Sequence, residues 1–223
     1  MSQDCRGRRC LFFEAVAESV MLFQYGSNMD ARVLSEKIRV YHGRYALSDT
    51  PVEAVFRGAA RLPGWRFGFG LYSLGLNGRV ADVVAAGPED EVWGALYELP
   101  RELVLRADGR RSVMDRIEGH RTERDPENYE PARVFVEYGE GSVEAWTYVG
   151  GEIARRRCLK QHAAATVSDE YAATILAGAA GAGLPDDYRA HLQKMIAACQ
   201  GSGGIAPEPS SSETERWRAG RWR

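Results

Sequence analysis

Short apolar runs that alternate with polar residues, and that end at glycine or proline, recur through the first half of the chain. Strands show this period-two pattern because successive side chains point to opposite faces of a sheet. The pattern predicts strands over residues 21–25, 55–62, 65–70, 81–86 and 92–99. The glycine-containing stretch 74–79 lies between two of these runs and predicts a loop.

Other patterns predict a hairpin and several helices. Alternating residues over 132–138 and 142–149 flank a turn of two glycines around Glu140, which is typical of a β-hairpin. Helical spacing and capping residues predict helices over 31–38, within 103–117, from Ser168 to about Gly181 or Gly183, and from Pro185 onward. Many strands with helices mostly at the two ends predict an α+β domain with a mixed, barrel-like β-sheet flanked by helices.

The two ends of the chain lack the periodicity of packed elements. After residue 199 the sequence is mostly Gly, Ser, Pro, Glu and Arg, which cannot bury enough apolar surface to offset chain entropy. We therefore expect an N-terminal extension without fixed structure over residues 1–19, one folded domain over 20–199 and a disordered tail over 200–223. The extension is either an appendage or the product of a misplaced start, with Met21 as the alternative first residue.

Charge and composition limit the partners. Hydrophobic residues make up 44% of the chain and charged residues 27%, with a formal net charge of −2. Such a chain has no overall field that attracts nucleic acid or an anionic membrane, and no run approaches the ~20 apolar residues of a membrane span. Glu14 and Glu18 interrupt the one apolar run that resembles an export signal. We expect a cytoplasmic monomer or homodimer that binds a small polar molecule.

Cysteine and histidine spacing gives no sign of a metal site. The four cysteines form no C-x-x-C pair, and no histidine stands at ligand spacing from them. They are interpreted as free thiols: Cys5, Cys10, Cys158 and Cys199. We expect no metal and no cofactor.

Several motifs occur together in the order of a known family. An apolar strand leads into Tyr25-Gly26-Ser27-Asn28-Met29, and a strand and turn follow over 58–65. Asp115-Arg116-Ile117-Glu118-Gly119 has the form D-x-x-E-G, and later segments over 145–148 and 183–188 continue the match. Over roughly residues 21–196 the chain resembles the γ-glutamyl cyclotransferases and their AIG2-like relatives.

The resemblance implies a cofactor-free enzyme of that activity. The α-amine of a γ-glutamyl compound attacks its own γ-carbonyl, which closes 5-oxoproline and releases an amino acid or amine. Intramolecular attack in a fixed geometry lowers a barrier by up to ~7–11 kcal/mol, so no protein nucleophile is required. Glu118 is the implied catalytic acid and base, provided that its surroundings raise its pKa towards neutrality.

The resemblance also places substrate-binding residues around the first strand. Backbone N–H groups of Gly26, Ser27 and Asn28 can hold a carboxylate or an oxyanion. Tyr25 is expected in the pocket wall, and Tyr148 either contacts the substrate carboxylate or belongs to the core. A Ser27 nucleophile is a rival interpretation that lacks a recognisable base motif. If Glu118 is not the catalytic acid, the next candidates are Asp82, Glu98 and Asp115.

The sequence does not identify which γ-glutamyl compound is the substrate. The segments 41–55 and 121–128 depart from the family pattern, and loops near a pocket set specificity. The asparagine at position 28 disfavours the glutathione-specific branch, whose tetrapeptide ends in leucine. Two alternatives remain: an enzyme that releases a γ-glutamyl-protected amine or isopeptide, and a non-catalytic binding module of the same fold.

Overall fold

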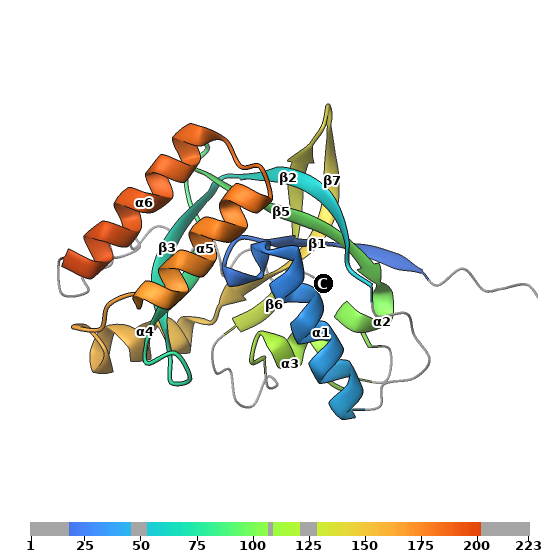
Figure 1. The fold of residues 1–223 in the computed structure, drawn as a ribbon, viewed down its shortest axis with the longest axis horizontal. Coiled ribbons are helices and arrows are strands. Elements are labelled where there is room, and N and C mark those ends of the chain that lie inside the picture. Colours follow the sequence, from blue (N-terminus) through green and yellow to red (C-terminus); the bar gives the residue numbers. More distant parts are fainter. Residues whose placement is uncertain (1–17, 46–52, 107–108, 121–128, 202–223) are drawn as a thin grey trace, which may run out of the picture.

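The computed structural model describes residues 18–45, 53–106, 109–120 and 129–201 (Figure 1). Its strands are β1 Ser19–Gln24, β2 Val55–Pro63, β3 Trp65–Ser73, β4 Gly78–Ala85, β5 Glu91–Pro100, β6 Tyr129–Tyr138 and β7 Gly141–Gly150. A 3-10 turn, η1, spans Ser27–Met29. The helices are α1 Ala31–Tyr45, α2 Arg101–Val104, α3 Val113–Ile117, α4 Glu152–Gln161, α5 Asp169–Gly181 and α6 Asp186–Gly201.

Five of the strands close into a barrel in the order β1-β5-β2-β6-β7. Neighbouring strands are antiparallel except at the closure, where β1 pairs with β7 in parallel at Leu22 and Trp146. A bulge between Phe56 and Gly58 shifts the β2–β5 register, and Gly58 takes a φ of 143° that side chains disfavour. Strands β3 and β4 form a separate two-stranded sheet. The predicted α+β fold with a mixed, barrel-like sheet is confirmed.

The apolar runs of the sequence form the core. Leu22, Phe23, Leu96 and Tyr97 are fully buried where β1 pairs with β5. Outside the barrel, α5 packs against α6 and against η1, α4 packs against β3, and α1 packs against α3 (Figure 1). These contacts bring the end of β1, the start of α1 and the end of α3 together.

The predicted helices and loop need three corrections. Helix α1 continues well beyond residue 38, and its cap is Asp30, whose carboxylate accepts the N–H groups of Arg32 and Val33 at 2.8 and 3.3 Å. Strand β4 begins at Gly78, so the loop over 74–79 is shorter than predicted. Helix α4 was not predicted, because its polar sequence EIARRRCLKQ lacks a clear apolar stripe.

The predicted ends fall mostly outside the described residues, which exclude 1–17 and 202–223. Within the described part, β1 already begins at Ser19, and the Glu18 carbonyl accepts the Arg101 N–H at 2.7 Å. Helix α6 continues to Gly201. None of the helices described is both long and apolar enough to cross a membrane.

Candidate active site

A pocket of about 200 Å³ lies where β1 ends, and residues of α1, α5 and the end of α3 line it. It brings together all six residues that the sequence predicted for the site: Tyr25, Gly26, Ser27, Asn28, Glu118 and Tyr148. It also includes residues that sequence reasoning did not assign: Gln24, Lys37, Tyr72, Ser73, Leu76, Val80, Ala81, Ile117, Gly119, Tyr129 and Tyr171. Segments that are far apart in the sequence, from Gln24 to Tyr171, therefore line one pocket.

The turn after β1 fits closely against neighbouring elements. Met29 N–H donates to the Gly26 carbonyl at 3.1 Å, which closes η1. A Cβ atom at Gly26 would lie 3.4 Å from both the Ala81 side chain and the Tyr171 hydroxyl. Glycine thus lets the turn lie against β4 and α5 and leaves the pocket open.

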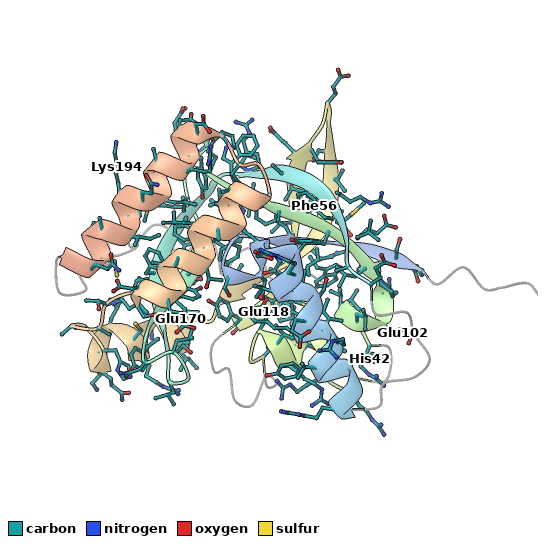
Figure 2. The ribbon with its side chains drawn as sticks, in the orientation of Figure 1. His42, Phe56, Glu102, Glu118, Glu170 and Lys194 are labelled. Atoms are coloured by element: carbon teal, nitrogen blue, oxygen red, sulfur yellow. The ribbon has the colours of Figure 1, made fainter. Side chains whose placement is uncertain are left out.

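Glu118 is placed by the way α3 begins and ends. Ser112 and Asp115 form a reciprocal capping box at the helix start. At the helix end, Glu118 N–H donates to the Met114 carbonyl at 2.9 Å, and Gly119 follows with a φ of 75°. The predicted C′ glycine is therefore confirmed. Figure 2 shows Glu118 between α1 and α5. The Glu118 side chain is half-buried and lines the pocket.

Two side-chain amides hold one oxygen of this carboxylate. Asn28 Nδ2 donates to Glu118 Oε1 at 2.8 Å, and Gln24 Nε2 donates to the same oxygen at 3.2 Å. Burial raises the pKa of Glu118, although the Lys37 charge and the two amide donors oppose that rise. A raised pKa favours a carboxyl group that both accepts and donates a proton.

Lys37 extends this network from α1. Its ammonium Nζ donates to Asn28 Oδ1 at 2.7 Å and lies 3.4 Å from Ser27 Oγ. Burial lowers the pKa of Lys37, and the negative charge of Glu118 partly offsets this effect. The amide of Asn28 therefore stands between the cation and the carboxylate and is oriented by both.

The tyrosines differ in what their hydroxyl groups contact. Tyr25 donates to the backbone carbonyl of Tyr148 at 2.5 Å, while Tyr148 donates to Asp115 Oδ1 at 2.9 Å. Burial raises the pKa of both, so both are neutral donors. Tyr148 lines the pocket, but its hydroxyl is engaged by Asp115 rather than presented to a ligand.

Not all backbone N–H groups of the turn lack a hydrogen-bond partner. Tyr171 accepts the Ala81 N–H at 3.1 Å, and Ser27 also hydrogen-bonds the Tyr171 hydroxyl oxygen through its backbone and its side chain. Tyr129 donates to the Ala81 carbonyl. The turn, β4 and α5 are thus linked through one tyrosine hydroxyl.

The other acids proposed from sequence lie outside the pocket lining. Asp82 is buried against Arg155, whose Nε lies 2.5 Å from Asp82 Oδ2. Glu98 accepts from Ser19 and Arg57 at the surface, and Asp115 caps α3. Each of these carboxylates therefore has a structural partner, and Asp115 also accepts from the pocket residue Tyr148.

Metal-ligating residues do not gather at the pocket. Across the described ranges, no three His, Cys, Asp or Glu residues are grouped closely enough to hold a metal ion. Cys158 and Cys199 are free thiols, as predicted, and burial raises the pKa of each. Cys5 and Cys10 lie outside the described residues.

Some of the missed residues left a signal in the sequence. Lys37 lies within the stripe Leu34, Lys37, Ile38 and Tyr41, whose i, i+3, i+4, i+7 spacing is that of a buried helix face. A charged residue in such a stripe indicates a polar site behind it. Tyr72, Tyr129 and Tyr171 left no comparable signal, because only the tertiary fold brings them to the pocket.

Comparisons with known proteins agree with this fold. The model of the AIG2-like family matches residues 91–192. A solved γ-glutamyl cyclotransferase is 22% identical, with a TM-score of 0.57 over 91% of this chain and 100% of that one. An uncharacterized protein from Homo sapiens is 23% identical, with a TM-score of 0.56 over 90% and 99% of the two chains.

A third solved structure, YkqA from Bacillus subtilis, is 20% identical with a TM-score of 0.57. The match covers 82% of this chain but 55% of YkqA. A comparison with curated proteins found no match. Residues 91–192 therefore match the AIG2-like family model, and over most of its length the chain has the fold of a solved γ-glutamyl cyclotransferase.

Proposed function

We propose that the protein is a γ-glutamyl cyclotransferase that converts a γ-glutamyl amide into 5-oxoproline and a free amino acid or amine. The observation that carries the proposal is the state of Glu118: a carboxylate at a small pocket, held through one oxygen by two amides, with a pKa raised by burial. One of the similar structures is itself a γ-glutamyl cyclotransferase.

In the proposed reaction, Glu118 first takes a proton from the substrate α-ammonium. Asn28 and Gln24 occupy Oε1, so the proton goes to Oε2. The freed amine attacks the γ-carbonyl carbon, and the new C–N bond closes a five-membered ring. The bond to the leaving nitrogen then breaks as that nitrogen receives the proton from Glu118. The surplus proton on the ring nitrogen passes to the released amine, which departs as an ammonium. The carboxylate is regenerated, and the atoms balance without a metal ion or organic cofactor.

The leaving-group side of the pocket includes Tyr72, Ser73 and Leu76 from the end of β3 and the turn that follows. These residues offer an aromatic ring, a hydroxyl and an apolar side chain, which can accept either an amino acid or an amine. A γ-glutamylamine cyclotransferase thus remains within the proposal, with the same role for Glu118.

The test is release of 5-oxoproline from γ-glutamyl-alanine, ε-(γ-glutamyl)-lysine, a γ-glutamyl alkylamine and glutathione, measured by chromatography with and without a chelator. We expect turnover of at least one of the first three and no effect of the chelator. Binding of these compounds without any 5-oxoproline, in the presence or absence of added divalent metals, would instead support a non-catalytic binding module.

A further inference from the structure

Lys37 is the positive charge of the pocket, and the described residues give it no ion-pair partner. Its ammonium contacts the neutral oxygens Asn28 Oδ1 and Ser27 Oγ, at 2.7 and 3.4 Å. An ammonium group carries three donors. Removing a charge from water is costly unless another charge compensates it. The charge of Glu118 offsets the effect of burial on the pKa of Lys37 only partly, and the hydrogen bonds of Lys37 go to neutral oxygens. A half-buried lysine of this kind at a pocket therefore fits an anionic group of a ligand.

The positions of Lys37 and Glu118 match the two charges of an α-amino acid. Asn28 alone separates them, with its amide oxygen towards the cation and its amide nitrogen towards the carboxylate. A free α-amino acid group alongside Asn28 would place its ammonium at Glu118 and its carboxylate at Lys37. The opposite orientation would bring like charges together at both ends, which is unfavourable.

We propose that Lys37 binds the α-carboxylate of the substrate and is the residue that makes the pocket prefer a carboxylate over a neutral group at that position. The inference rests on the proposed function and goes further, because it names the residue that determines this preference. Lys37 is a binding residue in this scheme, and Glu118 performs the proton transfers.

The interaction contributes mainly to substrate binding. The α-carboxylate keeps its charge throughout the reaction, so Lys37 stabilises the bound substrate and the transition state to similar degrees. Its loss should raise KM more than it lowers kcat. A hydrogen bond to a charged group is worth enough to change kcat/KM by roughly 10- to 100-fold.

The experiment compares γ-glutamyl-alanine with its derivative in which the glutamyl α-carboxylate is a carboxamide. We expect the wild-type protein to prefer the carboxylate by roughly 10- to 100-fold in kcat/KM. Lys37→Met should use both compounds equally, whereas Lys37→Arg should restore most of the preference. Lys194→Met is the matched control, because Lys194 is exposed on α6, away from Glu118 (Figure 2).

Two other roles for Lys37 predict different results. If Lys37 were a general base for Ser27, Lys37→Met would lower kcat equally for both compounds, and Lys37→Arg would not recover it. If Lys37 served only to orient Asn28, the preference for the carboxylate would survive in Lys37→Met. Either result would overturn the proposal, provided that thermal melting shows each variant to be folded.

Binding of the product separates this inference from the proposed reaction. Calorimetry would compare 5-oxoproline with its carboxamide on the wild-type and Lys37→Met proteins. A preference for 5-oxoproline that Lys37→Met abolishes supports the role of Lys37 even if no turnover is found. Turnover with a preference that Lys37→Met leaves intact refutes the role of Lys37 and preserves the enzyme. Binding of neither compound by the wild-type protein overturns the carboxylate site.

Discussion

Asn28 donates its side-chain amide to Glu118 Oε1 across 2.8 Å, although 90 positions separate the two residues in the sequence. The oxygen of the same amide accepts the Lys37 ammonium at 2.7 Å, which fixes the orientation of the amide. Asn28 thus fixes the position of the Glu118 carboxylate and links it through hydrogen bonds to the Lys37 ammonium. Because Gln24 shares Oε1, the other carboxylate oxygen is the one to which the proposed reaction assigns proton exchange with a substrate.

Glu118→Gln should nearly abolish turnover and leave product binding largely intact. The amide oxygen can still accept from Asn28 and Gln24, so the pocket keeps its shape, but the amide cannot carry the proton. General acid–base catalysis is worth ~10²–10⁴ in rate, and one group that serves both steps puts the loss at the high end. The measurement is kcat for 5-oxoproline release, with calorimetry of 5-oxoproline as the binding assay.

The matched control for this variant is Glu170→Gln, an exposed glutamate in the first turn of α5. It should retain wild-type kcat. A Glu118→Gln protein with more than about a tenth of the wild-type rate would contradict the assignment, since even the low end of the acid–base range exceeds that loss.

Gln24→Leu should move the acid limb of the pH–rate profile to higher pH. The Gln24 amide lowers the pKa of Glu118, so its removal leaves burial to raise that pKa further. The reaction begins with a Glu118 carboxylate, and the rate therefore rises as pH rises through its pKa. Profiles of kcat/KM would be compared with those of Gln193→Leu, an exposed position on α6. An acid limb at the same or lower pH would show that Gln24 does not act on Glu118.

Ser27→Ala distinguishes proton transfer by Glu118 from covalent catalysis by serine. Lys37 Nζ lies 3.4 Å from Ser27 Oγ, so the structure does offer a nearby amine. In the proposed reaction the hydroxyl only contributes a hydrogen bond, and its loss should lower kcat/KM by about tenfold or less. Complete loss of turnover, together with a glutamyl–enzyme adduct detected by mass spectrometry in the wild-type protein, would favour the serine nucleophile.

Much of the fold followed from local patterns. The hairpin of β6 and β7 formed where alternation predicted it, and the apolar run before Tyr25 forms β1, whose last three residues are buried. Gly119 was predictable because a helix that ends in the left-handed region favours glycine. The two halves of the site, Tyr25–Asn28 and Glu118, were identified from motifs that resemble a family.

The rest depended on tertiary contacts. Helix α4 carries three consecutive arginines, and Arg155 among them reaches Asp82 on β4, a pairing that no sequence period encodes. The pocket tyrosines that the sequence did not assign come from β3, β6 and α5, which only the tertiary fold brings together. Tyr171 interacts with Ser27 although 144 residues separate them, and no local pattern predicts such a contact.

Arg155→Met should destabilise the protein strongly. Asp82 is almost completely buried, and its carboxylate accepts from Arg155, the Gly150 N–H and the Val83 N–H. Removing one partner of a buried ion pair leaves an uncompensated charge and costs ~3–5 kcal/mol. Arg156→Met is the control, because Arg156 pairs with Glu152 at the exposed face of the same helix. Exposed pairs of this kind contribute ~0–1 kcal/mol. Urea denaturation of both variants would measure the difference, and equal midpoints would contradict it.

Glu118→Gln should also be more stable than the wild-type protein at neutral and alkaline pH. Burial raises the pKa of Glu118 in the folded state above the ordinary value that it takes in the unfolded chain. Between those two pKa values the folded state binds more protons, so the stability contributed by Glu118 falls as pH rises through that window. Glutamine carries no charge and avoids this loss. The free energies of unfolding of the two proteins should therefore coincide in acid, diverge as pH rises through the window and stay apart at higher pH.

Urea denaturation across the pH range would measure this difference, with Glu170→Gln as the exposed control that should follow the wild-type curve. A Glu118→Gln protein that is less stable than the wild type at alkaline pH would mean that Lys37, Asn28 and Gln24 stabilise the carboxylate more than burial penalises it.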